Sequence, residues 1–174
     1  MADGSLEFGG MPITTYKGKA MQQMIAVLRS FGMKHGYYNV KDAMECYRAD
    51  FIIECYCDSQ FGVLAKAAFN PDFKDPEKQG DILKDATAKG FDALFGQIEQ
   101  QLEKNGTKFV ASDKVTIADV VIAAFYFTNI NNPMNPFQAS FNTALENYPK
   151  SKAYLQHVDK EFKACNAKYK AVPF

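Results

Sequence analysis

Residues 116–125 read TIADVVIAAF, and this stretch decides the fold of the chain. Thr116 and Asp119 have the spacing of a capping box, in which each side chain accepts a hydrogen bond from the other residue's backbone amide. The following residues are apolar on every side of a helix, which is typical of a helix at the centre of a bundle. We therefore predict a buried central helix over 116–129. Thr116 and Asp119 are predicted to be structural cap residues whose replacement by alanine weakens folding.

Further helices are predicted around this segment from the spacing of apolar residues at three and four positions. They are expected over residues 41–69, 77–104 and 149–168. The stripe expected along one side of the first helix comprises Met44, Tyr47, Phe51 and Cys55. The stripe of the helix 77–104 comprises Phe91, Leu94, Phe95, Ile98 and Leu102. The stripe of the helix 149–168 comprises Leu155, Val158, Phe162 and Cys165. The proline-containing stretches NPDFKDPEK and NNPMNP separate these segments, so the larger part of the chain is predicted to be a helical bundle.

The N-terminal part carries the clearest strand signal in the chain. The stretch MPITTYK is rich in β-branched and aromatic residues, Lys17-Gly18 can form a turn, and KAMQ can return as a second strand. An amphipathic helix is expected to follow, from Met21 to Phe31, with Gly32 and Gly36 ending it. The bundle is thus predicted to be preceded by a β-hairpin and one helix.

Composition excludes several classes of protein. The 20 Lys and Arg residues balance the 20 Asp and Glu residues, so overall charge does not favour a nucleic-acid or membrane-surface partner. No apolar run approaches the ~18 residues of a membrane span, and the first ten residues lack the pattern of a secretory signal. The four cysteines are expected to be reduced, with Cys55 and Cys57 as buried thiols. Neither histidine has a cluster of cysteines or carboxylates beside it, so no metal site is predicted.

Taken in order, these segments resemble the cytosolic glutathione transferases, and the sigma-like class in particular. DKVTIADVVIAAF resembles that family's capping segment, and FGGMPITTYKGKAMQQMIAVLRSFGMKHGYY resembles its strand–strand–helix half-domain. RADFIIECYCDS and ENYPKSKAYLQHV resemble the first and last helices of its all-α domain. The resemblance implies a mainly α fold. It places a partial thioredoxin-like half-domain over residues 1–36 and an all-α C-terminal domain over residues 37–174.

The resemblance also implies that this chain is an N-terminally truncated member of the family. The family's thioredoxin-like domain begins with a strand–helix–strand unit, and such units need roughly 30 residues or more. Only about ten residues precede Met11-Pro12. In the family, the missing unit carries the Tyr, Ser or Cys that activates the glutathione thiol, whose pKa of about 8.5 leaves it mostly protonated at neutral pH. Tyr16 lies beyond the proline and is expected to pack on its strand, so we expect no catalytic residue.

The rest of the implied glutathione site is present in degenerate form. Met11 and Pro12 match the residue whose backbone pairs with the cysteinyl unit of glutathione and the family's cis-proline. Gln23 matches the glutamine that contacts the γ-glutamyl end, but Met24 stands where the family has Ser or Thr, and a thioether is a poor substitute for a hydroxyl donor. Asp58 matches an aspartate that reaches the γ-glutamyl amine across the dimer, although a solvated or structural carboxylate is an equal alternative. We expect no cofactor, or weak glutathione binding at most.

These departures predict a non-catalytic interaction or structural subunit of a larger assembly. Removal of the first family strand leaves a bare edge on the hairpin, so residues 6–32 are expected to bind a protein partner. Helices 41–69 and 77–104 are candidates for a family-type dimer. Two alternatives stay open: an active transferase that joins glutathione to hydrophobic electrophiles, and a non-catalytic carrier of hydrophobic ligands. The protein is expected inside the cell, in the cytoplasm or in an organellar or ciliary complex, and is not expected to be secreted.

Overall fold

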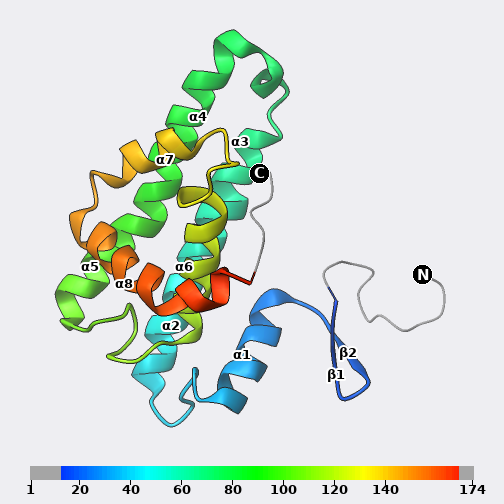
Figure 1. Ribbon diagram of the computed structural model, residues 1–174, viewed down its shortest axis with the longest axis vertical. Coiled ribbons are helices and arrows are strands. Elements are labelled where there is room, and N and C mark those ends of the chain that lie inside the picture. The colour runs from blue at the N-terminus through cyan, green and yellow to red at the C-terminus, as the bar shows by residue number, and fades with distance from the viewer. Residues whose placement is uncertain (1–12, 169–174) are drawn as a thin grey trace.

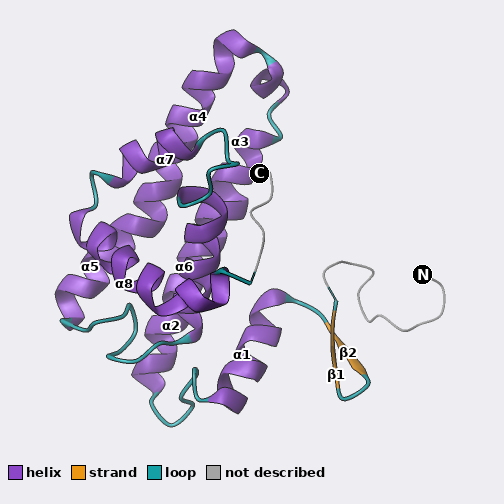
Figure 2. Ribbon diagram, in the orientation of Figure 1, coloured by secondary structure: helices purple, strands orange, loops and turns teal. Residues whose placement is uncertain are grey.

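The computed structural model describes residues 13–168 and is mainly helical, with one short β-hairpin (Figures 1 and 2). The N-terminal elements are β1 (Thr14–Tyr16), β2 (Lys19–Met21) and α1 (Met24–His35). The next elements are α2 (Ala43–Cys57), the π-helix η1 (Asp58–Leu64), α3 (Ala65–Ala68), the 3-10 turn η2 (Pro71–Lys74), α4 (Pro76–Phe91), the π-helix η3 (Asp92–Gly96) and α5 (Gln97–Asn105). The chain continues with α6 (Ile117–Phe125), the π-helix η4 (Tyr126–Ile130), α7 (Gln138–Leu145) and α8 (Pro149–Asn166). The sequence prediction of a mainly α fold, with a partial β-β-α unit before a helical bundle, is confirmed.

The hairpin forms where the sequence predicts it. β1 and β2 pair antiparallel with Thr15 opposite Ala20 and Tyr16 opposite Lys19. The two turn residues, Lys17 and Gly18, both have positive φ angles, 50° and 74°. Positive φ at both central residues is the requirement of a tight two-residue turn whose twist matches that of the strands.

Helix α1 begins later than the sequence pattern indicates. Met21 belongs to β2, and the helix starts at Met24 after Gln23, whose φ of 67° ends the extended strand conformation. The apolar spacing continues through the end of the strand, so periodicity by itself could not separate the two elements. The predicted C-terminal glycine signal does operate, because Gly36 adopts φ 80° and its N–H donates to the carbonyl of Gly32.

Helix α1 packs closely on the bundle at Gly32. A Cβ atom at this position would lie 2.5 Å from Ile117 Cγ2 and 2.9 Å from Tyr38 Cβ. The backbone of the same region is also joined, since the Ile117 N–H donates to the Tyr37 carbonyl over 3.0 Å. The absence of a side chain at Gly32 therefore permits α1 to approach the start of α6.

A pair of glycine substitutions tests this close approach. Gly32→Ala is expected to lower the free energy of unfolding by about 1–2 kcal/mol, because overpacking exceeds the gain in helix propensity. Gly80→Ala lies in α4, where a Cβ would meet nothing within 4 Å, and is expected to raise stability by about 0.5–1 kcal/mol. Urea denaturation followed by circular dichroism measures both. Equal effects of the two substitutions would show that Gly32 is not sterically required.

The segment from Ala43 to Ala68 is one continuous helical run, with η1 in its middle, which agrees with the long helix predicted over 41–69. The side that it buries differs in part from the predicted apolar stripe. Ala49, Ile52 and Ile53 are at most 1% exposed, whereas Met44 and Tyr47 are 56% and 57% exposed. The expected stripe is therefore divided: Met44 and Tyr47 lie on the surface, whereas Phe51 and Cys55 are partly buried against the core.

Aromatic rings fill the centre of the bundle. Phe91 and Phe95 of the α4–α5 run are fully buried, and their ring centroids lie 4.8 Å apart. Phe125 of α6 and Phe141 of α7 complete this core, at 6.3 and 5.5 Å from Phe91. The stripe predicted for 77–104 is thus buried except for Leu102, which is partly buried. Helix α6 is buried on nearly all sides, as its composition indicates.

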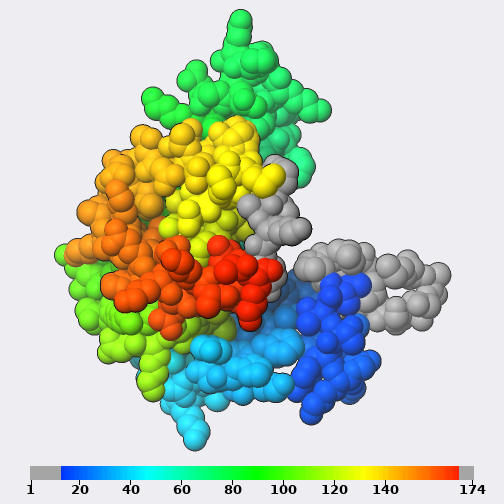
Figure 3. Space-filling view, viewed as in Figure 1, coloured from blue at the N-terminus to red at the C-terminus, as the bar shows by residue number. Residues whose placement is uncertain are grey.

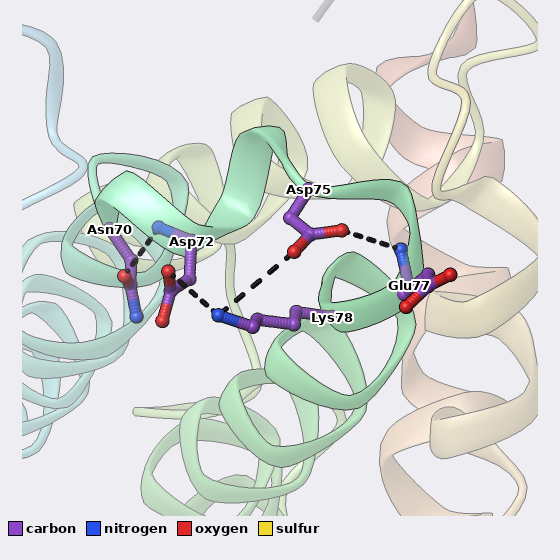
Figure 4. A network of polar contacts seen from close by, with 5 residues as sticks. All are labelled: Asn70, Asp72, Asp75, Glu77 and Lys78. Carbon is purple, nitrogen blue, oxygen red and sulfur yellow. Dashed lines mark hydrogen bonds and ion pairs between the residues drawn. The ribbon is translucent and has the colours of Figure 1, made fainter.

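A polar network holds the connection between α3 and α4, which forms the protruding upper end of the molecule in Figures 1 and 3. Asn70 accepts a hydrogen bond from the Asp72 amide, and Asp75 caps α4 by accepting from the Glu77 amide, each over 3.0 Å. Lys78 lies between Asp72 and Asp75, with its Nζ 3.1 and 3.9 Å from their carboxylates (Figure 4). These local bonds order a loop that carries the exposed side chain of Phe69.

Helices α7 and α8 close the bundle. The sequence prediction contained α8 but missed α7, although Phe141 and Leu145, four residues apart, are both buried. The start of α8 is capped from another helix, because Glu99 of α5 accepts hydrogen bonds from the amides of Lys150 and Ser151 over 2.7 and 3.0 Å. No helix within residues 13–168 combines the length and the apolar character that crossing a membrane requires.

Candidate functional site

The Asp119 carboxylate is the centre of the most extensively bonded buried polar site in the bundle. It accepts hydrogen bonds from the amide and hydroxyl of Thr116 over 2.7 and 2.9 Å. It also accepts from the Val110 amide at 3.3 Å and from the Tyr154 hydroxyl at 2.7 Å. The local sequence around Thr116 predicts the capping box, which is present, but not the partners from the preceding loop and from α8.

The electrostatics of this site are those of a structural carboxylate. Burial raises the pKa of the Asp119 carboxyl, and the hydrogen bonds from Tyr154 and Thr116 act in the opposite direction. Burial and the adjacent Asp119 charge raise the pKa of the Tyr154 hydroxyl well above its ordinary value. Both groups are almost completely buried, so the arrangement joins α6, α8 and the preceding loop and offers no access to a substrate.

The residues predicted to form a degenerate glutathione site are described only in part. Gln23 and Met24 lie together at the N-terminus of α1, and Met11 and Pro12 lie outside the described residues. Gln23 has φ 67° and ψ 109°, a sparsely populated backbone conformation of the kind that costs about 1–3 kcal/mol and occurs often at binding sites. Its side chain makes no capping hydrogen bond, and Met24 is 37% exposed. Asp58 is exposed at the first position of η1, on a different element from Gln23 and Met24.

Tyr16 of the hairpin packs against two side chains of α1. Its ring meets that of Phe31 edge-on, with centroids 5.4 Å apart. The Nζ of Lys34 lies 4.5 Å from the centre of the Tyr16 ring, a cation–π distance. The expected packing role of Tyr16 is therefore present in the structure.

A second polar cluster, which sequence reasoning missed, joins α1 to α2. The guanidinium of Arg29 contacts both carboxylate oxygens of Asp50, at 3.0 and 2.9 Å. The Tyr38 hydroxyl donates to the same carboxylate over 2.8 Å, and its partial burial beside Asp50 raises its pKa to about 12. Only the fold brings these residues together, because no local motif connects positions 29, 38 and 50.

Cys55 and Cys57 have the properties of unactivated thiols. Burial raises the pKa of the Cys55 thiol to about 11 and also raises that of Cys57, so both stay protonated at neutral pH. They are partly exposed, which corrects the expectation of fully buried thiols. Residues 13–168 contain no cluster of three or more His, Cys, Asp or Glu side chains that could hold a metal ion.

Comparison with known proteins connects this fold to one family. Residues 64–163, more than half of the chain, match the family described as "Glutathione S-transferase, C-terminal domain". A "Glutathione S-transferase" of Gallus gallus is 26% identical over 160 residues, which cover 89% of this chain and 70% of that protein. "Glutathione S-transferase 1" of Ascaris suum is 23% identical over 151 residues, covering 87% and 68% respectively.

Solved structures show the same fold over nearly the whole chain. The glutathione S-transferase of Ascaris lumbricoides superposes with a TM-score of 0.77 at 24% identity, covering 98% of this chain and 79% of that one. A monomeric glutathione S-transferase of the hookworm Necator americanus gives 0.75 at 22% identity, covering 98% and 79%. Prostaglandin synthase D of Nilaparvata lugens gives 0.72 at 18% identity, covering 97% and 78%. The family match over residues 64–163 shows that the chain belongs to the glutathione S-transferase family, and the solved structures share its fold.

Proposed function

We propose that this chain is an interaction or structural subunit built on the glutathione transferase fold, with little or no conjugating activity of its own. The observation that carries the proposal is Met24 at the first position of α1. A helix N-terminus offers free amides and a positive dipole end to a carboxylate, and a Ser or Thr there adds a hydroxyl donor. The thioether of Met24 adds no donor, so this part of the site holds glutathione less firmly.

The surroundings of Tyr16 support the same proposal. Thiolate formation needs a positioned donor, and such donors often contribute ~10²–10³ in rate. Tyr16, the tyrosine of the hairpin, has its ring between Phe31 and Lys34, so it is placed for packing. The proposal therefore assigns no catalytic role to Tyr16.

The hairpin supplies a surface for a partner protein. Within residues 13–168 the sheet consists of β1 and β2 alone, and in Figure 3 the hairpin lies beside the bundle. A two-stranded hairpin is marginally stable unless another element covers it, and open strand edges pair readily with another chain. We propose that an intracellular partner adds a strand to the edge of this hairpin, within residues 6–32.

Two assays test the proposal directly. The full chain is passed over immobilised glutathione and is then assayed for conjugation of glutathione to a hydrophobic electrophile. A family member with conjugating activity serves as the positive control. We expect weak retention and no conjugation above the uncatalysed rate, whereas conjugation at the rate of the control would contradict the proposal.

Replacement of Met24 by serine tests the role of this position. Met24→Ser is expected to raise the affinity for glutathione by about three- to tenfold, the contribution of one added hydrogen bond. Isothermal titration calorimetry measures the change. Met33→Ser is the matched control, because Met33 is 50% exposed on the same helix but lies away from its N-terminus. An unchanged affinity in Met24→Ser would remove the observation on which the proposal depends.

A family-type dimer is the second candidate, favoured by the exposed apolar stripe on α2. Met44 and Tyr47 are more than half exposed, and the Tyr47 ring lies 6.1 Å from that of Phe51. A second copy that covers this stripe would also approach Asp58 at the end of α2, and such a dimer favours an active transferase. Sedimentation equilibrium of the wild type and of Tyr47→Ser tests for this dimer. A wild-type dimer that is lost in the variant would support the dimer candidate, and a monomeric wild type would exclude it.

A further inference from the structure

The balanced charge of the whole chain conceals a strongly basic segment. Residues 13–41, from the hairpin to the start of α2, contain no Asp or Glu. The basic side chains of the segment are Lys17, Lys19, Arg29, Lys34 and Lys41. Arg29 is paired with Asp50, so the four lysines supply the segment's surface charge. The chain is neutral overall because the rest of it has an excess of acidic residues.

The fold gathers three of these lysines at one corner of the molecule. Lys34 Nζ lies 4.5 Å and Lys17 Nζ lies 5.6 Å from the centre of the Tyr16 ring. Lys19 is the cross-strand neighbour of Tyr16. Tyr16 therefore has two ammonium groups beside its ring, from the hairpin turn and from the last turn of α1, and a third lysine opposite it on β2.

Exposed apolar side chains lie at the same end of the molecule. The β1–β2 turn, the C-terminal end of α1 and the segment that leads into α2 all lie at the lower end of Figure 1. The apolar residues on these elements are Met33, Tyr37, Val40 and Met44, which are between 46% and 63% exposed. We call the four lysines of residues 13–41 together with these four apolar residues the basal surface.

The two acidic residues that follow the basic segment most closely lie at the N-terminus of α2. Asp42 accepts hydrogen bonds from the amides of Met44 and Glu45, each over 3.0 Å, so its charge faces the N-terminus of α2. Glu45, in the first turn of α2, is half-buried and also lies near this positive helix end. These two carboxylates reduce the positive potential of the basal surface, and within residues 13–168 no ion pair engages Lys17, Lys19 or Lys34.

We propose that the basal surface binds membranes rich in anionic phospholipid. Lysines around exposed apolar tips match a layer of negative headgroups above acyl chains, because the ammonium groups stay among the headgroups while the apolar tips enter below them. Recognition of individual phosphates on protein or nucleic acid favours the bidentate guanidinium of arginine, and Arg29 is occupied by Asp50. An acidic protein partner is the competing occupant.

The expected strength follows from the lysines. Each lysine near an anionic surface contributes about a fivefold increase in partitioning, so the three at the Tyr16 corner account for roughly 100-fold at low salt. This contribution falls as ionic strength rises, because the Debye length shortens from about 10 Å at 0.1 M to about 3 Å at 1 M. Binding is therefore expected to be reversible and strongly dependent on salt.

Vesicle sedimentation with the full chain tests the lysines. The vesicles contain phosphatidylserine and phosphatidylcholine in a ratio of about 1:2, against phosphatidylcholine alone. We expect partitioning to the anionic vesicles only, and a loss of roughly 100-fold in Lys17→Gln/Lys19→Gln/Lys34→Gln. The charge-matched control, Lys84→Gln/Lys160→Gln/Lys163→Gln, removes exposed lysines from α4 and α8 and is expected to lose fivefold or less. Equal losses in the two triple variants, or no binding by the wild type, would overturn the proposal.

A fluorescence experiment tests insertion of the apolar tips. The chain contains no tryptophan, so Val40→Trp introduces a single reporter at a position that is 63% exposed. Its emission is expected to shift to shorter wavelength with anionic vesicles, whereas Phe69→Trp, at the opposite end of the molecule, is expected not to shift. Poly-glutamate is the probe for an acidic protein. If the emission of Val40→Trp shifted with poly-glutamate but not with vesicles, the binding partner of the basal surface would be an acidic protein and not a membrane.

Discussion

Asp119→Ala is expected to lower the free energy of unfolding by about 3–5 kcal/mol, because four hydrogen bonds to one buried carboxylate are lost together. The substitution leaves the Tyr154 hydroxyl and the amides of Val110 and Thr116 buried without this acceptor. Domains of this size unfold with a total of about 5–15 kcal/mol, so the loss is a large fraction of the stability. Thermal denaturation should show a melting temperature lower by about 6–20 °C.

Two comparison variants separate the loss of the buried carboxylate from the loss of one hydrogen bond and from the loss of an exposed carboxylate. Tyr154→Phe removes one of the four donors and is expected to cost about 1–2 kcal/mol. Asp81→Ala removes an exposed carboxylate from α4 and is expected to change stability by less than about 0.5 kcal/mol. If Asp119→Ala behaved like Asp81→Ala, the carboxylate would not be the structural centre that the geometry indicates.

Phe91→Ala is expected to be as severe, at about 3–5 kcal/mol, because it removes a fully buried ring from the centre of the bundle. The ring contacts those of Phe95 and Phe141, with centroids 4.8 and 5.5 Å away. Since the neighbouring helices cannot collapse fully into the space, the loss combines burial with the cost of a cavity. Urea denaturation gives the free energy, and an unchanged denaturant slope would show that the unfolded state is the same.

Phe69→Ala is the matched control for Phe91→Ala. Phe69 is the same type of residue but is 86% exposed, at the C-terminal end of α3. Its replacement is expected to change stability by less than about 0.5 kcal/mol. A large loss in Phe69→Ala would instead mean that this ring is covered in solution, for example by another molecule.

The helices were predictable because their signals are local. The spacing of Phe91, Leu94, Phe95 and Ile98 indicates one buried face, and all four are fully buried. Asn105-Gly106 predicts the end of the α5 helix, and Gly106 adopts φ 63° there. These signals depend on neighbours within one helical turn, so they act whatever the rest of the chain does.

The sequence left open which side of a helix meets the rest of the bundle. On α2, the stripe through Met44 and Tyr47 and the stripe through Ala49 and Ile52 are both compatible with helical spacing. Packing against α6 selects the second, and it leaves the bulkier side chains exposed. The start of α1 was missed for a related reason, because the backbone conformation of Gln23 rather than side-chain polarity separates strand from helix.

The degenerate glutathione site stays a prediction, based on a set of residue types. Sequence places Gln23 and Met24 side by side, and the fold adds that they form the N-terminus of α1 with an unusual backbone at Gln23. The basal surface was hidden from composition, since the net charge of the chain is zero. A count within residues 13–41 reveals the basic segment, but the meeting of Lys34 with Tyr16 requires the turn of the hairpin to lie beside the end of α1.

Along the chain, local chemistry determined that there is a hairpin at Lys17-Gly18, a series of helices, and a capping box at Thr116. Turns, caps and helical faces involve residues within about four positions, so the sequence indicates them without knowledge of the tertiary contacts. The folded arrangement alone decided that Tyr154 donates to Asp119 and that Glu99 caps α8. The first pair is separated by 35 positions in the sequence, and Glu99 is separated from Lys150 by 51. Their distances depend on how whole helices pack, because shape and burial rather than neighbouring residues select the partners.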